Sequence, residues 1–545
     1  MAGNEVGKSW GQWIGGSARK FPSVMNRSFA LTEDPNSKSV NGAYNGDVHT
    51  ISYFARASYS LMDRYILTGT IRRDGSSNFG SGNRWGTFPS LAGAWRISEE
   101  PFMKDIAAVN NLKLRLGWGQ TGNAGNIAGK GVAALSGDAA YAFYVGGNGV
   151  SGYWGNRTRE TGWFAPLVDT NLKWETTEMT NIGLDFAFLN DWDITLDYFV
   201  KNTKDLLLVQ QIRPTAGFTS VYTNYGEIQN KGFEFAVGYH KQLTKDFSFN
   251  ARLTGSTISN KVKKMGDPIY SEATGGNNAD AASGFDGSQV GAVDGNGHWA
   301  RHSICMEGEA VGSFYGFLTD GLIKDEADLA EYSKLVDDYS KANNEHPLAI
   351  GDVKFRDVND DGKIDDDDRV ILGNGFPTLN YGLNLGATYK DWDFSIYMYG
   401  VLGQDILSYS AMKLSSMTQL DDQTTPNILK SAYNEAFRNG SGTLPRLSIG
   451  DYSRNTRVSD LWVKNGDFLR ISNIQVGYTL PKDLCNKLSV QKARVYVGVS
   501  NLLTISGYNK YGDPEVGTGS ILFQGLDTGR YPMPRTFMAG LNVTF

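Results

Sequence analysis

An alternation of apolar and polar residues constrains this chain most, and it is clearest in the last eleven residues, RTFMAGLNVTF. The residues of one parity are apolar: Phe537, Ala539, Leu541, Val543 and Phe545. A period of two predicts a β-strand with one apolar face and one small or polar face. Soluble chains usually end in polar, frayed residues, whereas this strand ends on an aromatic one. The pattern favours the wall of a membrane barrel, and a half-buried strand of a soluble β-sandwich is the alternative.

Hairpins with this alternation recur between Ile51 and Phe545, and we count 13 predicted strands there. Two clear hairpins span residues 182–200 and 379–398, and they turn at Asn190-Asp191 and Lys390-Asp391. Single-chain bacterial barrels have an even number of strands, so an odd count predicts further strands upstream. The predicted fold class is therefore all-β, an antiparallel transmembrane β-barrel.

Aromatic residues and loop lengths separate a barrel from a sandwich. Tyr and Trp gather near the short turns, as in an interfacial girdle: Tyr59, Tyr65, Trp192, Tyr389 and Trp392. Short turns alternate with loops of tens of residues, such as those after Gln120, Lys261, Gly403 and Leu503. Membrane barrels follow this strict alternation of short periplasmic turns and long outer loops, and sandwiches do not.

Charge, cysteine content and hydropathy exclude several other classes. A net charge of −6 gives no basic footprint, so no nucleic acid partner is predicted. Cys305 and Cys485 are far apart and support neither a disulfide framework nor a zinc site. No run approaches the roughly 18 apolar residues of a membrane helix. The first residues lack the apolar stretch of a signal peptide, which an outer-membrane protein needs, so either the barrel interpretation is wrong or the true N-terminus is missing.

The sharpest motif is the acidic stretch DVNDDGKIDDDD at residues 357–368. Its oxygen donors have the spacing of a calcium loop: Asp357, Asn359, Asp361, the Lys363 carbonyl, Asp365 and Asp368. Gly362 stands where such loops turn sharply. Position 12 is Asp instead of Glu, and the flanks read as extended segments, so we predict structural Ca²⁺ that staples the loop. The alternative is a metal-free acidic turn held by Asx hydrogen bonds.

Candidate substrate contacts are aromatic. Tyr144, Trp154 and Trp163 crowd one Gly-rich outer loop, where exposed rings could stack on sugars or grip peptides. Packing of loop against loop is the alternative. No nucleophile–base–acid set stands out, so no catalytic residue and no enzymatic activity are predicted, although spacing does not reveal a triad assembled in space.

Several stretches, taken in chain order, resemble one family. They include RRDGSSNFGSGNRWGTFPS at residues 72–90, GEIQNKGFE, GSFYGFLTDG, GDVKFRDVNDDGKIDDDDRVILGN and the terminal GLNVTF. They resemble the SusC/RagA family, which are TonB-dependent outer-membrane transporters of the Bacteroidetes. The resemblance runs from about residue 51 to residue 545, nearly the whole chain.

The resemblance implies a 22-stranded barrel with a plug in its lumen, embedded in outer-membrane lipid. It further implies import of oligosaccharides or peptides, powered by TonB through the missing N-terminal region and capped by a SusD-like surface lipoprotein. We expect the loops after Lys261 and Gly403 to meet that lipoprotein. Residues 51–545 would form the C-terminal 13 or so strands, including the calcium-type loop 357–368. Residues 1–50 would be a loop or an incomplete upstream barrel segment. A passive porin-like barrel and a calcium-stapled surface β-protein or adhesin are the alternatives.

Overall fold

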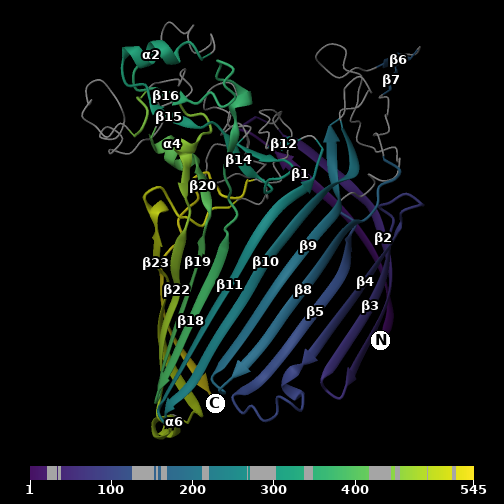
Figure 1. Cartoon of the computed structure of the whole chain (residues 1–545), viewed down its shortest axis with the longest axis vertical. Coiled ribbons are helices and arrows are strands. Elements are labelled where there is room, and N and C mark those ends of the chain that lie inside the picture. The colour runs from purple at the N-terminus through teal and green to yellow at the C-terminus, as the bar shows by residue number, and fades with distance from the viewer. Residues whose placement is uncertain are drawn as a thin grey trace. The chain divides into compact units, whose positions relative to one another are not determined.

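The computed structural model describes residues 1–20, 33–34, 38–125, 152–154, 158–160, 169–211, 220–266, 268–270, 302–336, 348–415, 443–447, 455–487, 489–517 and 523–545. Within these ranges the dominant element is an antiparallel sheet of 14 strands in the order β1-β2-β3-β4-β5-β8-β9-β10-β11-β18-β19-β22-β23-β25 (Figure 1). The order follows the chain, as a succession of hairpins requires. The prediction of an all-β antiparallel fold is confirmed.

The bounds of the long strands are β1 Ala2–Ser17, β2 Ser39–Leu61, β3 Tyr65–Ser76, β4 Trp85–Arg96, β5 Val109–Asn123, β8 Glu175–Phe188, β9 Trp192–Gln211, β10 Ser220–Thr244, β11 Phe247–Lys264, β18 Leu379–Tyr389, β19 Trp392–Leu402, β22 Phe468–Thr479, β23 Lys492–Ser506 and β25 Thr536–Thr544. The short strands are β6 Gly152–Trp154, β7 Thr158–Glu160, β12 Ile269–Tyr270, β13 Ser303–Cys305, β14 Ser313–Gly316, β15 Thr319–Leu322, β16 Val353–Phe355, β17 Val370–Gly373, β20 Asp405–Ser408, β21 Val463–Asn465 and β24 Leu526–Asp527.

The helices are short: α2 Glu326–Tyr332, α4 Tyr409–Ser415, α6 Lys482–Lys487, and the 3₁₀ helices η3 Ile97–Glu99, η8 Asp366–Asp368, η10 Asp460–Trp462 and η11 Gly507–Lys510. Among the described residues, no helix has the length and apolar character that crossing a membrane demands.

The chain divides into two compact units. Unit 1 comprises Met1–Trp95, Arg115–Asn181 and Lys201–Glu227, and unit 2 comprises Arg96–Leu114, Ile182–Val200 and Ile228–Phe545.

In unit 1, β1 pairs with β2 in antiparallel register from Ala2 opposite Ala55 to Ser17 opposite Ser39. The sequence pattern did not predict β1, because its stretch AGNEVGKSWGQWIGGS is rich in glycine and polar residues. The 13 strands from β2 onward agree with the predicted number, and β1 makes 14 in the described sheet. The expectation of a further strand upstream of the 13, drawn from their odd number, is therefore confirmed by β1, and the 22-stranded barrel stays a prediction.

In unit 2, the register of β18, β19, β22, β23 and β25 gathers aliphatic side chains on one face of the sheet. Leu385 pairs with Ile396, Ile396 pairs with Ile474, and Ile474 pairs with Val499. We call this face the apolar band; its members are Leu383, Leu385, Ile396, Met398, Ile474, Val476, Val495, Val497, Val499, Ala539, Leu541 and Val543. Directly paired side chains lie on the same face of a sheet, so the band is continuous across five strands.

Aromatic rings line the short-turn ends of the strands in unit 2. Trp192 lies 5.9 Å from Phe188 and 4.7 Å from Tyr239, measured between ring centroids, and Trp392 lies 4.8 Å from Tyr478. Rings at these separations contact one another across neighbouring strands. The predicted clustering of aromatic residues at the short turns is therefore confirmed in this unit.

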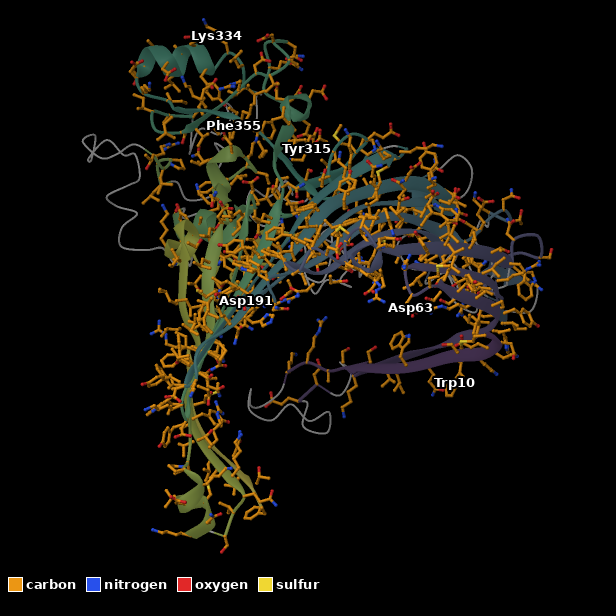
Figure 2. All side chains as sticks on the ribbon, turned by 60° about the horizontal axis from the view of Figure 1, so that its bottom comes forward. Trp10, Asp63, Asp191, Tyr315, Lys334 and Phe355 are labelled. Atoms are coloured by element: carbon orange, nitrogen blue, oxygen red, sulfur yellow. The ribbon has the colours of Figure 1, made fainter. Side chains whose placement is uncertain are left out.

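The buried core of unit 2 lies outside the long strands. Residues 302–336 and 348–373, here called the cap, contain α2 and the short pairs β13–β14, β14–β17 and β15–β16 (Figure 1). A cluster of apolar residues fills it: Phe317, Leu322, Ile323, Tyr332, Val336, Val353, Phe355 and Ile364. Figure 2 shows Phe355 within the cap and Lys334 at its periphery. The described residues of the cap, which belong to the loop after Lys261, thus form a small domain with a core of its own.

Candidate substrate-contact cavity

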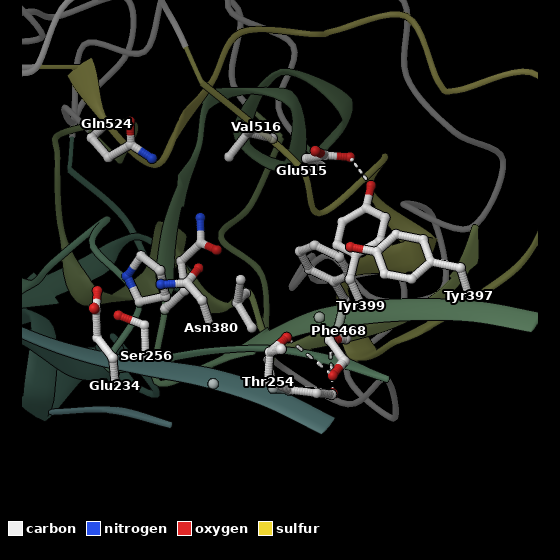
Figure 3. Close-up of a pocket in the computed structure, with 17 residues that line it drawn as sticks. Glu234, Thr254, Ser256, Asn380, Tyr397, Tyr399, Phe468, Glu515, Val516 and Gln524 are labelled. Carbon is white, nitrogen blue, oxygen red and sulfur yellow. Dashed lines mark hydrogen bonds between the residues drawn. The ribbon is translucent and has the colours of Figure 1, made fainter. Parts of the chain in front are cut away.

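A cavity of about 530 Å³ lies on the face of the unit 2 sheet opposite the apolar band (Figure 3). Neighbouring strands supply most of its lining: Glu234 from β10, Thr254 and Ser256 from β11, Asn380 from β18, Tyr397 and Tyr399 from β19, and Phe468 from β22. Ser256 pairs with Asn380, so register alone brings these polar side chains together. We call this the strap cavity, after the segment that roofs it.

Three aromatic rings form one wall of the strap cavity. Tyr397 and Tyr399, two residues apart on β19, stack with ring centroids 6.0 Å apart. Phe468 meets Tyr399 edge to face at 5.9 Å. Tyr397 is 44% exposed, so its ring is available to a ligand. Alternate residues of one strand project to one face, which explains why the two tyrosines act together.

The roof is the strap, residues 507–535, which connects β23 to β25 and is described at 507–517 and 523–535. Glu515, Val516 and Gln524 of the strap line the cavity. The Tyr399 hydroxyl donates a hydrogen bond of 2.9 Å to Glu515 Oε2, as the dashed line in Figure 3 marks. The strap is thus attached to the aromatic wall that it covers.

Arg470 anchors the strap to the sheet. It projects from β22 with its side chain 1% exposed, and its Nη1 donates to Glu515 Oε2 at 2.7 Å. Its Nη2 donates to Asp513, and its Nε donates to Thr504 at 2.9 Å. A buried guanidinium is stable only when it is paired and hydrogen-bonded, and here all three nitrogens have partners.

Asp513 is held in its charged form. Burial by itself raises the pKa of this carboxyl group, but backbone N–H groups of Glu515 and Met533 and the Arg470 guanidinium outweigh it. The pKa of Asp513 therefore lies below its ordinary value, and the ion pair with Arg470 is formed at neutral pH.

A second attachment of the strap is made by Tyr508, near its first residue. Tyr508 is fully buried, and its hydroxyl donates to Asp527 and lies within hydrogen-bond distance of the Ser408 hydroxyl. Burial, followed by the charge of Asp527, raises the pKa of Tyr508, so the hydroxyl stays protonated and remains a donor. Tyr508 therefore joins two parts of the strap to each other and to Ser408 of β20.

The strap cavity offers hydrogen bonds and stacking but no available cation. Arg470 is engaged by two carboxylates, and Glu234 and Glu515 are the charged residues that line the cavity. Amide and hydroxyl groups of Thr254, Ser256, Asn380, Gln404 and Gln524 complete the lining. Such a surface suits hydroxyl-rich, amide-bearing or cationic ligands, because an anion would meet the carboxylate of Glu234 and a Glu515 whose charge Arg470 already balances.

Unit 1 has a cavity of about 860 Å³, lined by residues of β1 to β5 and by Trp174 and Asn181. Arg72 lies in it, with Nε 2.7 Å from Asp74, and with Nη2 2.9 Å from Ser52 and 3.2 Å from Glu5. Phe88, Trp118 and Trp174 supply aromatic surface. This cavity combines a paired cation with aromatic rings.

Two ion pairs in unit 2 span three strands each. Arg494 of β23 reaches Asp393 of β19, with Nε 2.8 Å from Oδ1, across Gly477 of β22. A Cβ on Gly477 would lie 2.3 Å from Arg494 Nη2, so only glycine leaves room for this crossing. Arg252 and Asp193 cross Gly238 in the same way, where a Cβ would lie 2.1 Å from the Asp193 carboxylate.

The first half of the predicted calcium loop is tightly turned. Asp357 accepts hydrogen bonds from the backbone N–H groups of Asp361 at 3.2 Å and Gly362 at 2.8 Å. Asn359 also accepts from Asp361, at 3.0 Å, and Asp361 accepts from the N–H of Lys363, at 3.0 Å. Gly362 has φ +83°, the conformation that the turn position of such a loop needs. Oxygens of Asp357 and Asn359 thus both accept from the Asp361 N–H, which brings them to the same side of the turn.

The second half of the loop uses its oxygens differently. Asp368 is fully buried, and its two oxygens accept from the N–H groups of Val358 at 2.8 Å and Asp365 at 2.9 Å. Asp365 caps η8 by accepting from the N–H of Asp367. In the described part of the chain, no three His, Cys, Asp or Glu side chains are grouped as a metal site. Calcium binding therefore stays a prediction.

The predicted aromatic substrate contacts lie outside what the structure describes. Tyr144 and Trp163 fall in stretches that are not described, and Trp154 ends β6 with a side chain that is not described.

Sequence reasoning missed the strap cavity. Arg470 and Asp513 are separated by 43 residues, and no local motif marks them as partners. The sequence offers one signal: Arg470 stands inside the alternating strand FLRISNIQVGYT, at a position on the same face as polar residues.

These observations define a class, namely a two-faced antiparallel wall with one aliphatic face and one polar face that carries cavities. A family model for the β-barrel of TonB dependent receptor-like proteins matches residues 2–502, and the chain belongs to that family.

Relatives agree with this assignment. The TonB-dependent receptor SusC of Bacteroides thetaiotaomicron is 32% identical over 508 residues, which are 91% of this chain and 44% of SusC. TonB-dependent receptor P3 of Formosa agariphila is 30% identical over 527 residues, which are 95% of this chain and 47% of that receptor. The predicted resemblance to the SusC/RagA family is confirmed. The chain spans about half the length of the curated relatives that it matches.

Among solved structures, the RagAB peptide transporter superposes with a TM-score of 0.73 over 100% of this chain and 53% of that one, at 21% identity. The likeness supports the fold.

Proposed function

We propose that this chain forms part of the barrel wall of a SusC-like outer-membrane importer. The observation that carries the proposal is the opposition of two faces on the same strands of unit 2. One face is the apolar band, which suits lipid, and the other bears the strap cavity, which suits a polar solute. Barrel strands that cross a membrane alternate in this way.

Transport and not catalysis is the activity that we infer. The cavity is lined by groups that hydrogen-bond and stack, and import requires binding without covalent chemistry. By analogy with the relatives, TonB would supply the energy and a SusD-like lipoprotein would cover the outer end of the barrel, where the cap lies. A passive porin-like wall is the competing function.

The substrate class that we propose is a neutral or cationic oligosaccharide or peptide. Glu234 and Glu515 line the strap cavity, and Arg470 is not available to an anion because it is fully paired. Tyr397 offers a ring face for a sugar or an apolar peptide side chain. The RagAB structure is that of a peptide transporter, which makes peptides a reasonable first library to screen.

The test is uptake and binding by the full-length gene product in cells. Tyr397→Ala should weaken substrate binding about 3- to 10-fold, the contribution of one aromatic contact. The matched control is Tyr531→Ala, since Tyr531 is 84% exposed and does not line the cavity. Equal losses in both variants, or none in either, would contradict a binding role for the strap cavity. Uptake that persists in cells lacking TonB would favour the porin-like function.

For the acidic loop we propose a structural Ca²⁺. Asp357, Asn359 and Asp361, with the Lys363 carbonyl, are the residues that would hold it, and the first two already have oxygens on the same side of the turn, where both accept from the Asp361 N–H. Asp365 and Asp368 would have to exchange backbone hydrogen bonds for the cation. The ion would neutralise the crowded carboxylates and stiffen the cap, with no part in transport itself.

A further inference from the structure

A second cavity in unit 2 lies beside the end of β23 that extends beyond its partner strand β25. Thr536, the first residue of β25, pairs with Ser500, whereas β23 continues to Ser506. Strap residues fill the space beside this unpaired edge and leave a groove of about 470 Å³. We call it the rim groove, and the residues used here are Asn501, Leu503, Asn509, Lys510, Met533 and Arg535.

The rim groove continues the apolar band. Register through the bulged end of β23 places Leu503 opposite Ile471, which in turn pairs with Met398 of the band. Leu503 is 45% exposed, Ile505 is 55% exposed and Met533 is 45% exposed, so apolar surface remains open beside the groove.

The height of the band matches the hydrocarbon layer. From Val495, beside the aromatic row, to Ile505 the strand rises about 33 Å at about 3.3 Å per residue. At the tilt of about 40° typical of barrel strands, this is about 25 Å, the height of the apolar band of an outer-membrane barrel. Lys510 follows the end of β23 at Ser506, whereas Arg535, next to Thr536, lies level with Asn501. The long side chain of Arg535 would therefore extend along the groove to bring its charge to the level of the lipid headgroups.

The charge of the rim groove is positive. Lys510 and Arg535 line it, and neither has a carboxylate within ion-pair distance in the described part of the chain. The carboxylate among its lining residues, Asp513, is already paired with Arg470. Lys464 and Lys510 flank the ring of Tyr511, with ammonium nitrogens 5.8 Å and 4.9 Å from its centroid.

The pKa of Lys464 reflects burial and the crowding of cations beside the groove. Burial lowers the pKa of this lysine, and repulsion from Lys510 lowers it further. Two neighbouring ammonium groups that repel each other provide a site where an anion is stabilising.

We propose that the rim groove binds the phosphate headgroup of an anionic lipid of the outer leaflet. Lys510 and Arg535 contact the phosphate, and Leu503 and Met533 contact the acyl chains. Asn501 and Asn509 each donate to the phosphate with the second amide hydrogen, since the first donates to the carbonyls of Pro534 and Thr504. Apolar contacts beside the cations distinguish this ligand from free phosphate. The inference rests on the proposed placement of the wall in the outer membrane.

The test measures lipid retained by the full-length gene product in mixed micelles, counted by native mass spectrometry. Phosphatidylglycerol is the probe, phosphatidylcholine is the zwitterionic comparison, and inorganic phosphate is the competitor. Lys510→Ala/Arg535→Ala should lower phosphatidylglycerol retention about 30-fold, because each basic residue near a lipid surface contributes about fivefold. The matched control is Lys324→Ala/Lys334→Ala, since both lysines are exposed and lie in the cap, outside the long strands.

Equal retention by the double variant and the wild type would overturn the proposal. Displacement of the lipid by inorganic phosphate at equal concentration would also overturn it, because the site would then bind a free anion. The conservative Lys510→Arg/Arg535→Lys variant should retain the lipid, which separates lost charge from lost folding. Localisation in the membrane fraction and substrate uptake are measured in parallel. If the protein stays in the membrane fraction but shows no lipid preference, only the rim groove proposal is refuted. If the wild-type protein is absent from the membrane fraction, the proposed function is refuted.

Discussion

Replacing Arg470 by methionine is the sharpest perturbation of the strap. Methionine keeps most of the volume and removes the charge, so Asp513 is left as a carboxylate that is only 8% exposed without its cation. Breaking a buried ion pair by removing one partner costs about 3–5 kcal/mol. Glu515 is 41% exposed and regains water, so the lower end, about 3 kcal/mol, applies here. Because 1.4 kcal/mol is a factor of ten, strap opening should become about 100-fold more frequent.

Amide hydrogen exchange of the full-length protein checks this value. The backbone N–H groups of Glu515 and Met533 donate to Asp513, so their exchange in Arg470→Met should rise about 100-fold. Amides of the β22–β23 ladder near Ile474 and Val499 are the internal control and should not change. Arg470→Met/Asp513→Asn should recover part of the protection, since the orphaned charge is gone. Exchange that rises equally in strap and ladder, or a strap that does not respond, would refute the anchoring role.

The same anchor predicts a pH dependence. The pKa of Asp513 is lower in the folded protein than its unfolded value of about 3.9, so the unfolded state binds the proton more tightly. The stabilisation is therefore fully present above about pH 4 and is lost as the pH falls through the lower, folded pKa. Strap protection should stay constant between about pH 8 and pH 5 and decline only in stronger acid.

Three further predictions concern the wall and the cap. Leu385→Arg should destabilise the wall by about 2–4 kcal/mol if that residue is near the bilayer midplane, whereas Asn384→Arg on the polar face should cost much less. Denaturant titration in lipid measures both costs, and equal costs would contradict the assignment of faces. Gly477→Ala should displace the crossing arginine and destabilise by about 1–3 kcal/mol, while Gly69→Ala, where a Cβ meets nothing within 4 Å, serves as control in the same titration. A chelator should speed hydrogen exchange across residues 352–372 and leave the long strands unchanged; no response in that range would count against bound Ca²⁺.

The long strands were predictable because their information is local. Alternation within Leu379–Tyr389 and Trp392–Leu402 specifies both the strands and the faces that they present, and the two-residue turn between them fixes their register. β1 escaped prediction because its glycines and polar residues carry no alternation, and its pairing with β2 holds it in the sheet. The cap escaped because its core joins short elements whose apolar residues have no period to detect.

The strap cavity was not predictable for a different reason. Its residues come from five strands, the strap and the loops beside β18 and β19, and each looks unremarkable within its own segment. Register is the step that converts them into a site, because Ser256 faces Asn380 only when β11 and β18 are paired as observed. Gly477 was unpredictable for the same reason. The sequence shows a glycine there, but it does not show the ion pair between the strands on either side that makes a glycine necessary.

The strap connects the two proposals through the direction of its charges. Its carboxylates at 513 and 515 turn toward Arg470, and the second of them lines a cavity on the polar face, while Lys510 and Arg535 line the groove that continues the apolar band. If the acidic and basic side chains of the strap were interspersed, the solute would also meet cations and the lipid phosphate would also meet carboxylates. Glu515 thus places negative charge where a neutral or cationic solute binds, and Lys510 and Arg535 place positive charge where lipid phosphates would lie. Arg470 makes this separation effective, since it pairs with Asp513, the carboxylate that lines the rim groove.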